Sequence, residues 1–191
     1  MATISIIGTG NMGQAIAGIA GKGDHTVQLI GQNDKATAAT GDIVVLAVPY
    51  ASIPAVLAER GASLAGKVVV DITNPLDFET FDDLVVPADG SAAAEIAAAL
   101  PDSKVLKAFN TTFAGTLASS TVGPLTTTVL IAGDNADAKA TLAGIVTSGG
   151  VNAIDAGSLK RARELEALGF LQLTLAANEK VSWTGGFGVA A

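Results

Sequence analysis

A glycine-rich turn near the amino terminus constrains the fold of this chain more than any other feature. It has the pattern G-x-G-x-x-G and reads Gly8-Thr9-Gly10-Asn11-Met12-Gly13. A short apolar run precedes it, a helical stretch follows, and another apolar run begins at Thr26. In such a βαβ unit the backbone N–H groups at the start of the helix bind phosphate. Gly8 permits the tight turn, Gly10 the approach of a pyrophosphate, and Gly13 close packing of helix on strand.

Beyond this turn, short β-rich runs alternate with alanine-rich stretches. The alternation predicts one α/β domain over residues 1–191, a Rossmann-type doubly wound parallel sheet with a C-terminal helix. The expected strands are Thr3–Gly8, Thr26–Gly31, Asp42–Val48, Lys67–Ile72, Lys104–Phe109, Thr126–Ala132 and Asn152–Asp155. The expected helices are Met12–Gly21, Ala51–Leu64, Ser91–Leu100, Ala136–Thr147 and Leu159–Asn178. The connection Gln32–Gly41 is too short for a full crossover helix, so we expect at most one helical turn there.

Composition excludes several classes of function. The chain has 11 lysines and arginines against 18 acids, so we expect no nucleic-acid partner. It has no cysteine and one histidine, so we expect no metal centre. No apolar run approaches the roughly 20 residues that span a bilayer. The first residues also lack the pattern of a signal peptide, so we expect a cytoplasmic protein with no membrane association.

The end of the second expected strand bears on the choice of nicotinamide cofactor. An NAD site usually has Asp or Glu there, about 20 residues beyond the glycines. The sequence reads Gly31-Gln32-Asn33-Asp34-Lys35, with no acid directly at the strand end. Gln32 and Asn33 are neutral donors, Lys35 is a point charge for a 2′-phosphate, and we expect no arginine to bind that phosphate bidentately. The sequence thus favours NADP by a small factor, with NAD also possible.

The glycine turn resembles the opening of the NADP-dependent coenzyme F420 reductases and of the related cytosolic domains of the STEAP metalloreductases. Further similar segments follow in order along nearly the whole chain. They are Ala47-Val48-Pro49-Tyr50, Asp71-Ile72-Thr73-Asn74-Pro75, Lys107-Ala108-Phe109-Asn110-Thr111, and Asp155-Ala156-Gly157 followed by Leu159, Ala162 and Leu165-Glu166.

The resemblance implies a role for each segment. Thr9, Asn11 and Met12 would line the pyrophosphate. The run Ala47-Val48-Pro49-Tyr50 would border the adenosine side or the linking phosphates. The residues framing the nicotinamide would be Asn74, Pro75, Ala108, Phe109 and Asn110. Family members often carry Gly-Ser-Arg where this chain has Gly31-Gln32-Asn33, so the 2′-phosphate site departs from the family pattern.

Few side chains at the expected ligand edge exchange protons. His25 falls at the amino end of the strands, opposite the edge where ligands bind, and is interpreted as a surface residue. Tyr50 is expected to pack against the cofactor rather than act as an acid. Lys107 is expected to snorkel or pair at the sheet edge, although a catalytic role stays open. Asp71 and the acids at 77–83 are interpreted as loop and solvation residues.

With no catalytic residue assigned, the sequence favours hydride transfer between nicotinamide and a flavin or F420-type deazaflavin, because there the cofactors carry the reaction. Two other hypotheses stay open. One is a non-catalytic dinucleotide sensor or interaction module, which the short second crossover favours. The other is the cofactor domain of a β-hydroxyacid or pyrroline-carboxylate dehydrogenase, which would need a longer helical C-terminal part.

The C-terminal segment carries the remaining expectations. The basic run Lys160-Arg161-Ala162-Arg163 is either a solvated face with Arg–Glu pairs or a contact for an anionic acceptor or a partner. The stretch Ala167–Ala177 is apolar nearly all round, which predicts a homodimer through this helix. The tail 179–191, with Trp183 and Phe187, is expected to close over the second ring or to pack on the domain or a partner subunit.

Overall fold

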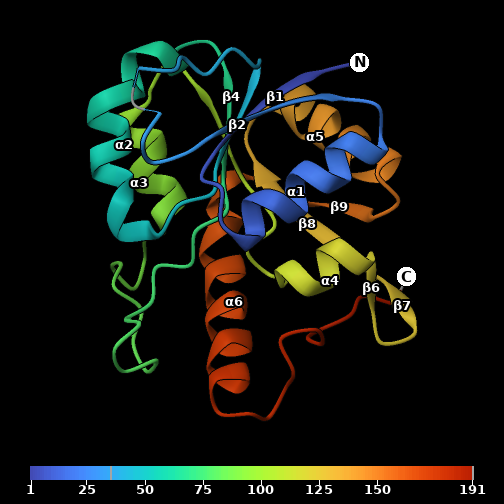
Figure 1. The fold of residues 1–191 in the computed structure, drawn as a ribbon. Helices are drawn as coiled ribbons and strands as arrows, with labels where there is room; N and C mark the ends of the chain where they lie inside the picture. The colour runs from blue at the N-terminus through green and yellow to red at the C-terminus, as the bar shows by residue number, and fades with distance from the viewer. Residues whose placement is uncertain (35, 191) are drawn as a thin grey trace.

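The computed structural model describes residues 1–34 and 36–190, and its centre is a seven-stranded sheet covered on both faces by helices (Figure 1). The strands lie in the order β2-β1-β3-β4-β5-β8-β9. Their bounds are β1 Thr3–Ile7, β2 Thr26–Ile30, β3 Ile43–Leu46, β4 Val68–Asp71, β5 Lys104–Lys107, β8 Thr128–Gly133 and β9 Asn152–Gly157. All seven predicted strands are therefore confirmed, with ends that differ by up to two residues.

The first five strands run parallel, but β8 pairs antiparallel with β5, and β9 runs parallel to β8. The predicted parallel sheet is therefore confirmed for most of its strands, and the β5–β8 pair is the exception. After β5 the chain forms only the short helix α4 (Ala114–Ser119) and the hairpin of β6 (Thr121–Val122) and β7 (Leu125–Thr126). These stay near the carboxyl ends of the strands, so the next strand starts from that edge and runs the opposite way (Figure 1).

Two helical layers bury the two faces of the sheet. Helices α1 (Asn11–Lys22) and α5 (Ala136–Ser148) cover one face, and α2 (Ile53–Arg60) and α3 (Ala92–Ala99) cover the other (Figure 1). Strand β3 is an unbroken apolar run because both of its faces are buried. Ile43 and Val45 join the core under α1 and α5, whereas Val44 and Leu46 join the core under α2 and α3.

Two of the predicted helices are longer than the α-helices observed, because the predicted ranges also contain short 3₁₀ turns. The 3₁₀ turns η1 (Tyr50–Ser52) and η2 (Gly61–Leu64) flank α2, and η3 (Leu159–Arg161) precedes α6 (Ala162–Ala177). The predicted helix Ala51–Leu64 is therefore three consecutive pieces. The short α4 and the β6–β7 hairpin were not predicted, because elements of two to six residues carry no readable periodicity.

The strand order creates a crevice at one place. From β1 the chain goes to β2 on one side, while β3 lies on the other side of β1. Ligands of open α/β sheets bind outside the carboxyl ends of the strands at such a reversal. The described part of the connection 31–42 contains no helix, as predicted. Lys35, assigned above to a 2′-phosphate, lies outside the described residues.

Helix α6 extends beyond the carboxyl edge of the sheet, with the loop 72–91 on one side and the C-terminal tail on the other (Figure 1). Only one side of it is buried, through Ala162, Leu165, Glu166, Gly169, Gln172 and Ala176. Leu171 on the other side is half exposed. Within the ranges described above, no helix combines the length and apolar character needed to cross a membrane.

Candidate functional site

The glycine turn connects β1 to α1 at the place where the strand order reverses. Gly8 has a φ of +119°, and a Cβ on it would lie 2.0 Å from the carbonyl oxygen of Ala47. A Cβ on Gly13 would lie 2.3 Å from the carbonyl oxygen of Gly8. The fold itself therefore requires these two glycines. A Cβ on Gly10 would meet no described atom within 4 Å, so only a ligand would require glycine there.

The start of α1 is open to a ligand. Gly10 is the N-cap of the helix and supplies no capping side chain. Thr9, Gly10 and Asn11 are all exposed at the carboxyl edge. The first N–H groups of an α-helix have no partner within the helix and carry a partial positive charge. The turn thus presents exposed donors where a pyrophosphate would lie.

The side of the crevice where adenosine is expected is formed after β2 and β3. Pro49 is exposed there, and Val48 and Tyr50 are half-buried. The Tyr50 hydroxyl donates a hydrogen bond to Glu95 on α3. Burial and this bond raise the pKa of Tyr50 to about 12. Tyr50 is therefore neutral near neutral pH, and its hydroxyl is already hydrogen-bonded to Glu95.

An arginine that the sequence did not associate with this region lies beside it. Arg60, at the end of α2, donates to the carbonyl oxygen of Asp34 over 2.9 Å and to that of Thr37. Helix α2 brings Arg60 to this loop although the two lie 26 residues apart in the sequence. The guanidinium fixes the path of the loop through backbone oxygens.

On the other side of the glycine turn lies a pocket of about 450 Å³. It is lined by Asn11, Met12, Ile72, Asn74, Asn110, Thr112, Phe113, Ala114, Gly115, Leu173, Trp183 and Thr184. No lining side chain titrates near neutral pH. Asn11 and Met12 connect the pocket to the phosphate-binding turn, so one ligand can occupy both places.

Two asparagines form the inner wall of this pocket. Asn74 Nδ2 donates to the carbonyl oxygen of Asn110 over 3.0 Å, and Asn110 Nδ2 donates to Asn74 Oδ1 over 3.0 Å. Asn110 Nδ2 also donates to the carbonyl oxygen of Leu165 on α6, over 2.8 Å. A Cβ on Gly169 would lie 2.3 Å from Asn74 Oδ1, so glycine allows α6 to pass directly against the pair. Asn110 Oδ1 is buried without a hydrogen-bond partner among the described residues.

The other residues assigned to the nicotinamide contribute differently. Phe109 has a φ of +63°, and Asn110 N donates to the carbonyl oxygen of Ala108 over 2.8 Å, which closes a γ-turn. Such a turn is strained in a residue other than glycine. The side chains of Pro75, Ala108 and Phe109 are all buried. None of the three is among the residues that line the pocket, and Ala108 and Phe109 form the turn that carries Asn110.

A buried ion network lies behind the pocket. Lys107 Nζ is 2.8 Å from Asp71 Oδ2 and 2.9 Å from Glu166 Oε1, and it donates to the carbonyl oxygen of Thr73 over 2.6 Å. Glu166 in turn accepts from the first two N–H groups of α3. All three ionic side chains are at most 1% exposed.

This network corrects two expectations. Lys107 does not snorkel. It forms ion pairs, the other outcome predicted for it, but inside the sheet rather than at its edge, where two carboxylates enclose its ammonium. Asp71 is the buried last residue of β4 and not a solvated loop acid. Burial raises the pKa of the Glu166 carboxyl, and the charge of Lys107 opposes that rise. None of the three side chains lines the pocket, so the network positions the loops and α6.

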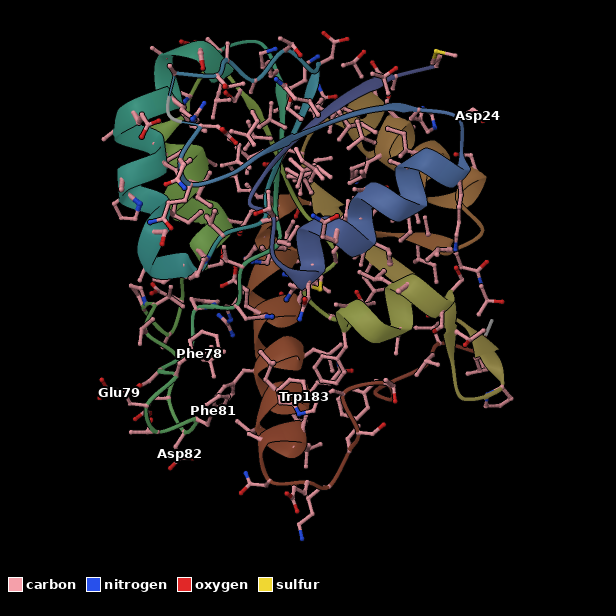
Figure 2. The ribbon with its side chains drawn as sticks, viewed as in Figure 1. Asp24, Phe78, Glu79, Phe81, Asp82 and Trp183 are labelled. Atoms are coloured by element: carbon pink, nitrogen blue, oxygen red, sulfur yellow. The ribbon has the colours of Figure 1, made fainter. Side chains whose placement is uncertain are left out.

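The C-terminal tail contributes Trp183 and Thr184 to the pocket lining, and Trp183 lies beside α6 (Figure 2). The Trp183 ring packs at 5.1 Å from the Phe113 ring and stays half exposed. Phe187 N donates to Gln172 Oε1 on α6 over 2.9 Å. The tail thus packs on its own domain and also brings an aromatic face to the pocket.

Two other expectations concern residues away from the pocket. His25 accepts from Ala2 N and lies 3.1 Å from Ser148 Oγ at the amino end of the sheet, so it has a structural role remote from the pocket. The basic run at the start of α6 pairs with Glu164, through Arg161 at 3.6 Å and Arg163 at 4.0 Å. These exposed pairs agree with a solvated face.

The fold and the site together define a Rossmann-type dinucleotide-binding domain. Comparison with known proteins defines it more closely. A family model described as NADP oxidoreductase coenzyme F420-dependent matches residues 26–75. The F420-dependent NADP reductase of Methanocaldococcus jannaschii is 32% identical over 161 residues, which cover 82% of this chain and 72% of that protein. The chain belongs to this F420-dependent NADP oxidoreductase family.

Two further comparisons agree with the resemblance that the motifs indicated. The metalloreductase STEAP3 of Rattus norvegicus is 37% identical over 107 residues, which are 55% of this chain and 20% of that protein. The crystal structure of a putative F420-dependent NADP-reductase from Arthrobacter sp. FB24 matches all of both chains, with a TM-score of 0.84 and 28% identity. The fold is therefore shared over the full length, including α6 and the tail.

Proposed function

We propose that this chain is a cytoplasmic oxidoreductase that binds NADP(H) and passes hydride between the nicotinamide and a deazaflavin of the F420 type, or a related flavin ring. The relatives named above as F420-dependent NADP reductases support the cofactor pair. The observation that carries the proposal is the pocket, which adjoins the glycine turn and whose lining, among the described residues, contains no titratable side chain. Hydride transfer between two rings requires none.

The residues present fit a dinucleotide. The exposed N–H groups at the start of α1 would hold the pyrophosphate over Gly10, where a Cβ would meet no described atom. Asn110 Oδ1 is a buried acceptor that lacks a donor among the described residues, and it would accept from the nicotinamide carboxamide. Asn74 holds the Asn110 side chain in place.

The chain would catalyse the reaction by position. When bound, NADPH supplies a hydride, and the balancing proton comes from solvent. The Asn74–Asn110 pair would position the inner ring, while Phe113, Leu173 and Trp183 would form an apolar outer wall beside it. Correct placement of two reactants contributes a large part of a rate enhancement without any group that transfers protons.

The single tryptophan provides a direct test. Trp183 is the only tryptophan of the chain and lines the pocket, so we expect its fluorescence to be quenched as NADPH is titrated in. Steady-state turnover is then measured with F420, FMN, FAD and ferric chelates as acceptors. We expect the highest kcat/KM with F420. Binding of NADPH with no turnover on any acceptor would favour a dinucleotide sensor instead.

A matched pair of tail variants tests the outer wall. Trp183→Leu removes the aromatic face from the pocket, and we expect kcat/KM for the acceptor to fall about tenfold or more with little change in NADPH affinity. Phe187→Leu is the control, because Phe187 is exposed on the same tail and does not line the pocket. Equal losses in both variants would mean that the tail acts only through packing.

We also propose that two copies associate through the exposed side of α6. Leu171 is 50% exposed there, and Phe78, on the loop beside α6, is 55% exposed (Figure 2). Exposed large apolar side chains are common at protein interfaces. Light scattering is expected to show a dimer at micromolar concentration and a monomer for Leu171→Glu. Ala140→Glu, at an exposed position of α5, is the control and should stay dimeric.

A further inference from the structure

The loop after β2 folds an acidic side chain back onto the end of that strand. Asp34 Oδ2 accepts a hydrogen bond from Gly31 N over 2.8 Å, and Asp34 N donates to the carbonyl oxygen of Gly31 over 3.1 Å. Thr37 N donates to the carbonyl oxygen of Asp34 over 2.9 Å, and Arg60 donates to the same oxygen over 2.9 Å. Asp34 is therefore held by hydrogen bonds to Gly31, Thr37 and Arg60.

The carboxylate occupies a defined place in the crevice. A Cβ built on Gly31 would lie 3.1 Å from Asp34 Oδ2 and 3.8 Å from Thr9 Cγ2. The carboxylate therefore lies close to the point where a side chain at position 31 would begin, and Thr9 of the glycine turn is close to the same point. Asp34 also follows the last glycine of the turn, Gly13, at about the distance of 20 residues at which NAD-binding proteins have their acid.

We propose that Asp34 is a specificity-determining residue that admits NAD(H) and weakens the binding of NADP(H). This inference rests on the proposed function. The carboxylate would accept from the 2′-hydroxyl of an adenosine ribose. A 2′-phosphate carries between one and two negative charges near neutral pH, so it would be repelled at the same place.

The hydrogen-bonding state of the strand end strengthens the argument. The N–H of Gly31 would be a backbone donor to a 2′-phosphate, but it already donates to Asp34. Two of the guanidinium nitrogens of Arg60 donate to backbone carbonyl oxygens of the same loop. Gln32 and Asn33 are exposed neutral amides, which bind a hydroxyl as readily as a phosphate. The described residues thus favour a ribose hydroxyl over a phosphate at this place.

The test is calorimetric titration of the whole protein with NADP⁺ and with NAD⁺. Asp34→Asn removes the charge at constant size, and we expect NADP⁺ affinity to rise about tenfold, equivalent to about 1.4 kcal/mol. NAD⁺ affinity is expected to fall a few-fold, because an amide is a weaker acceptor for the ribose. Asp34→Ser, which opens the same space, should change the ratio in the same direction. The gain for NADP⁺ should shrink as salt is added.

Asp24→Asn is the matched control. Asp24 lies before β2 at the opposite end of the sheet (Figure 2), and asparagine tolerates its φ of +58°. The control makes the same change of net charge and should leave both affinities unchanged.

An unaltered NADP⁺ to NAD⁺ affinity ratio in folded Asp34→Asn and Asp34→Ser would overturn the role of Asp34 alone. If the wild-type protein bound neither dinucleotide, the proposed function would fail as well. A rise in NADP⁺ affinity in the control equal to that in the variants would assign the effect to net charge and would also overturn the inference.

Discussion

The substitution Lys107→Met tests whether the buried ion network supports the site. Methionine has nearly the volume of lysine and no charge, so packing on β5 is retained while the ammonium is lost. Asp71 Oδ2 at 2.8 Å and Glu166 Oε1 at 2.9 Å would then face each other without the cation. Both carboxylates are at most 1% exposed, so water cannot replace it.

The expected loss of stability follows from this geometry. Removing one partner of a buried ion pair typically costs about 3–5 kcal/mol, because the remaining charge stays buried. Domains are stable by about 5–15 kcal/mol, so the variant is expected to fold but to lose a large part of its margin. With a urea m-value of about 2 kcal/mol per M, a loss of about 4 kcal/mol lowers the unfolding midpoint by about 2 M.

The loss of stability caused by Lys107→Met should depend on pH in a defined direction. Burial raises the pKa of Glu166 above its ordinary value, and Lys107 opposes that rise. A group whose pKa is higher in the folded state contributes stability below its unfolded pKa, and this contribution is lost as the pH rises through the folded pKa. Without Lys107 the pKa of Glu166 rises further, so a proton is taken up more easily on folding. The destabilisation by Lys107→Met should therefore be smaller at about pH 5 than at about pH 8.

Urea unfolding followed by circular dichroism at both pH values measures these quantities. Lys104→Met is the control, since Lys104 is exposed on the same strand, and it should change stability by less than about 0.5 kcal/mol. The double variant Lys107→Met with Glu166→Gln should recover part of the loss, because one uncompensated charge is removed. A loss below about 1 kcal/mol, or one that does not vary with pH, would refute the role given to this network.

Three other predictions concern the site directly. Gly10→Val should leave the unfolding midpoint nearly unchanged and abolish dinucleotide binding in calorimetry, since a Cβ there meets no described atom and only a pyrophosphate needs the space; retained binding would remove the turn from the site. Gly169→Ala should push α6 away from the Asn74–Asn110 pair and reduce kcat by about 100-fold, and rates equal to wild type would contradict the close contact. The pKa of Tyr50 is about 12, so Tyr50 stays neutral in the wild-type protein between about pH 6 and 9. Turnover should therefore be flat over this pH range, and Tyr50→Phe should leave it flat.

The sequence alone determined the features that depend on residues close to one another along the chain. Continuous apolar runs predict strands buried on both faces, and the spacing of Gly8, Gly10 and Gly13 between strand and helix predicts a phosphate-binding turn. These signals are local, because one strand, one turn and one helix start contain all the residues involved. For the same reason, the number of residues after β2 was enough to predict that this connection contains no full helix.

Only the tertiary structure decided how distant segments meet. Asp34 looked displaced from the strand end in the sequence, but a turn returns its carboxylate to Gly31 N. Glu166 reaches Lys107 across 59 positions of the chain, and only the packing of α6 against β5 and α3 makes the lysine a buried network residue. Hydrogen bonds and ion pairs depend on distances in space. Strand order and helix placement therefore decide which residues distant in the sequence form them. The spacing of the sequence fixes them only within a single turn or helix.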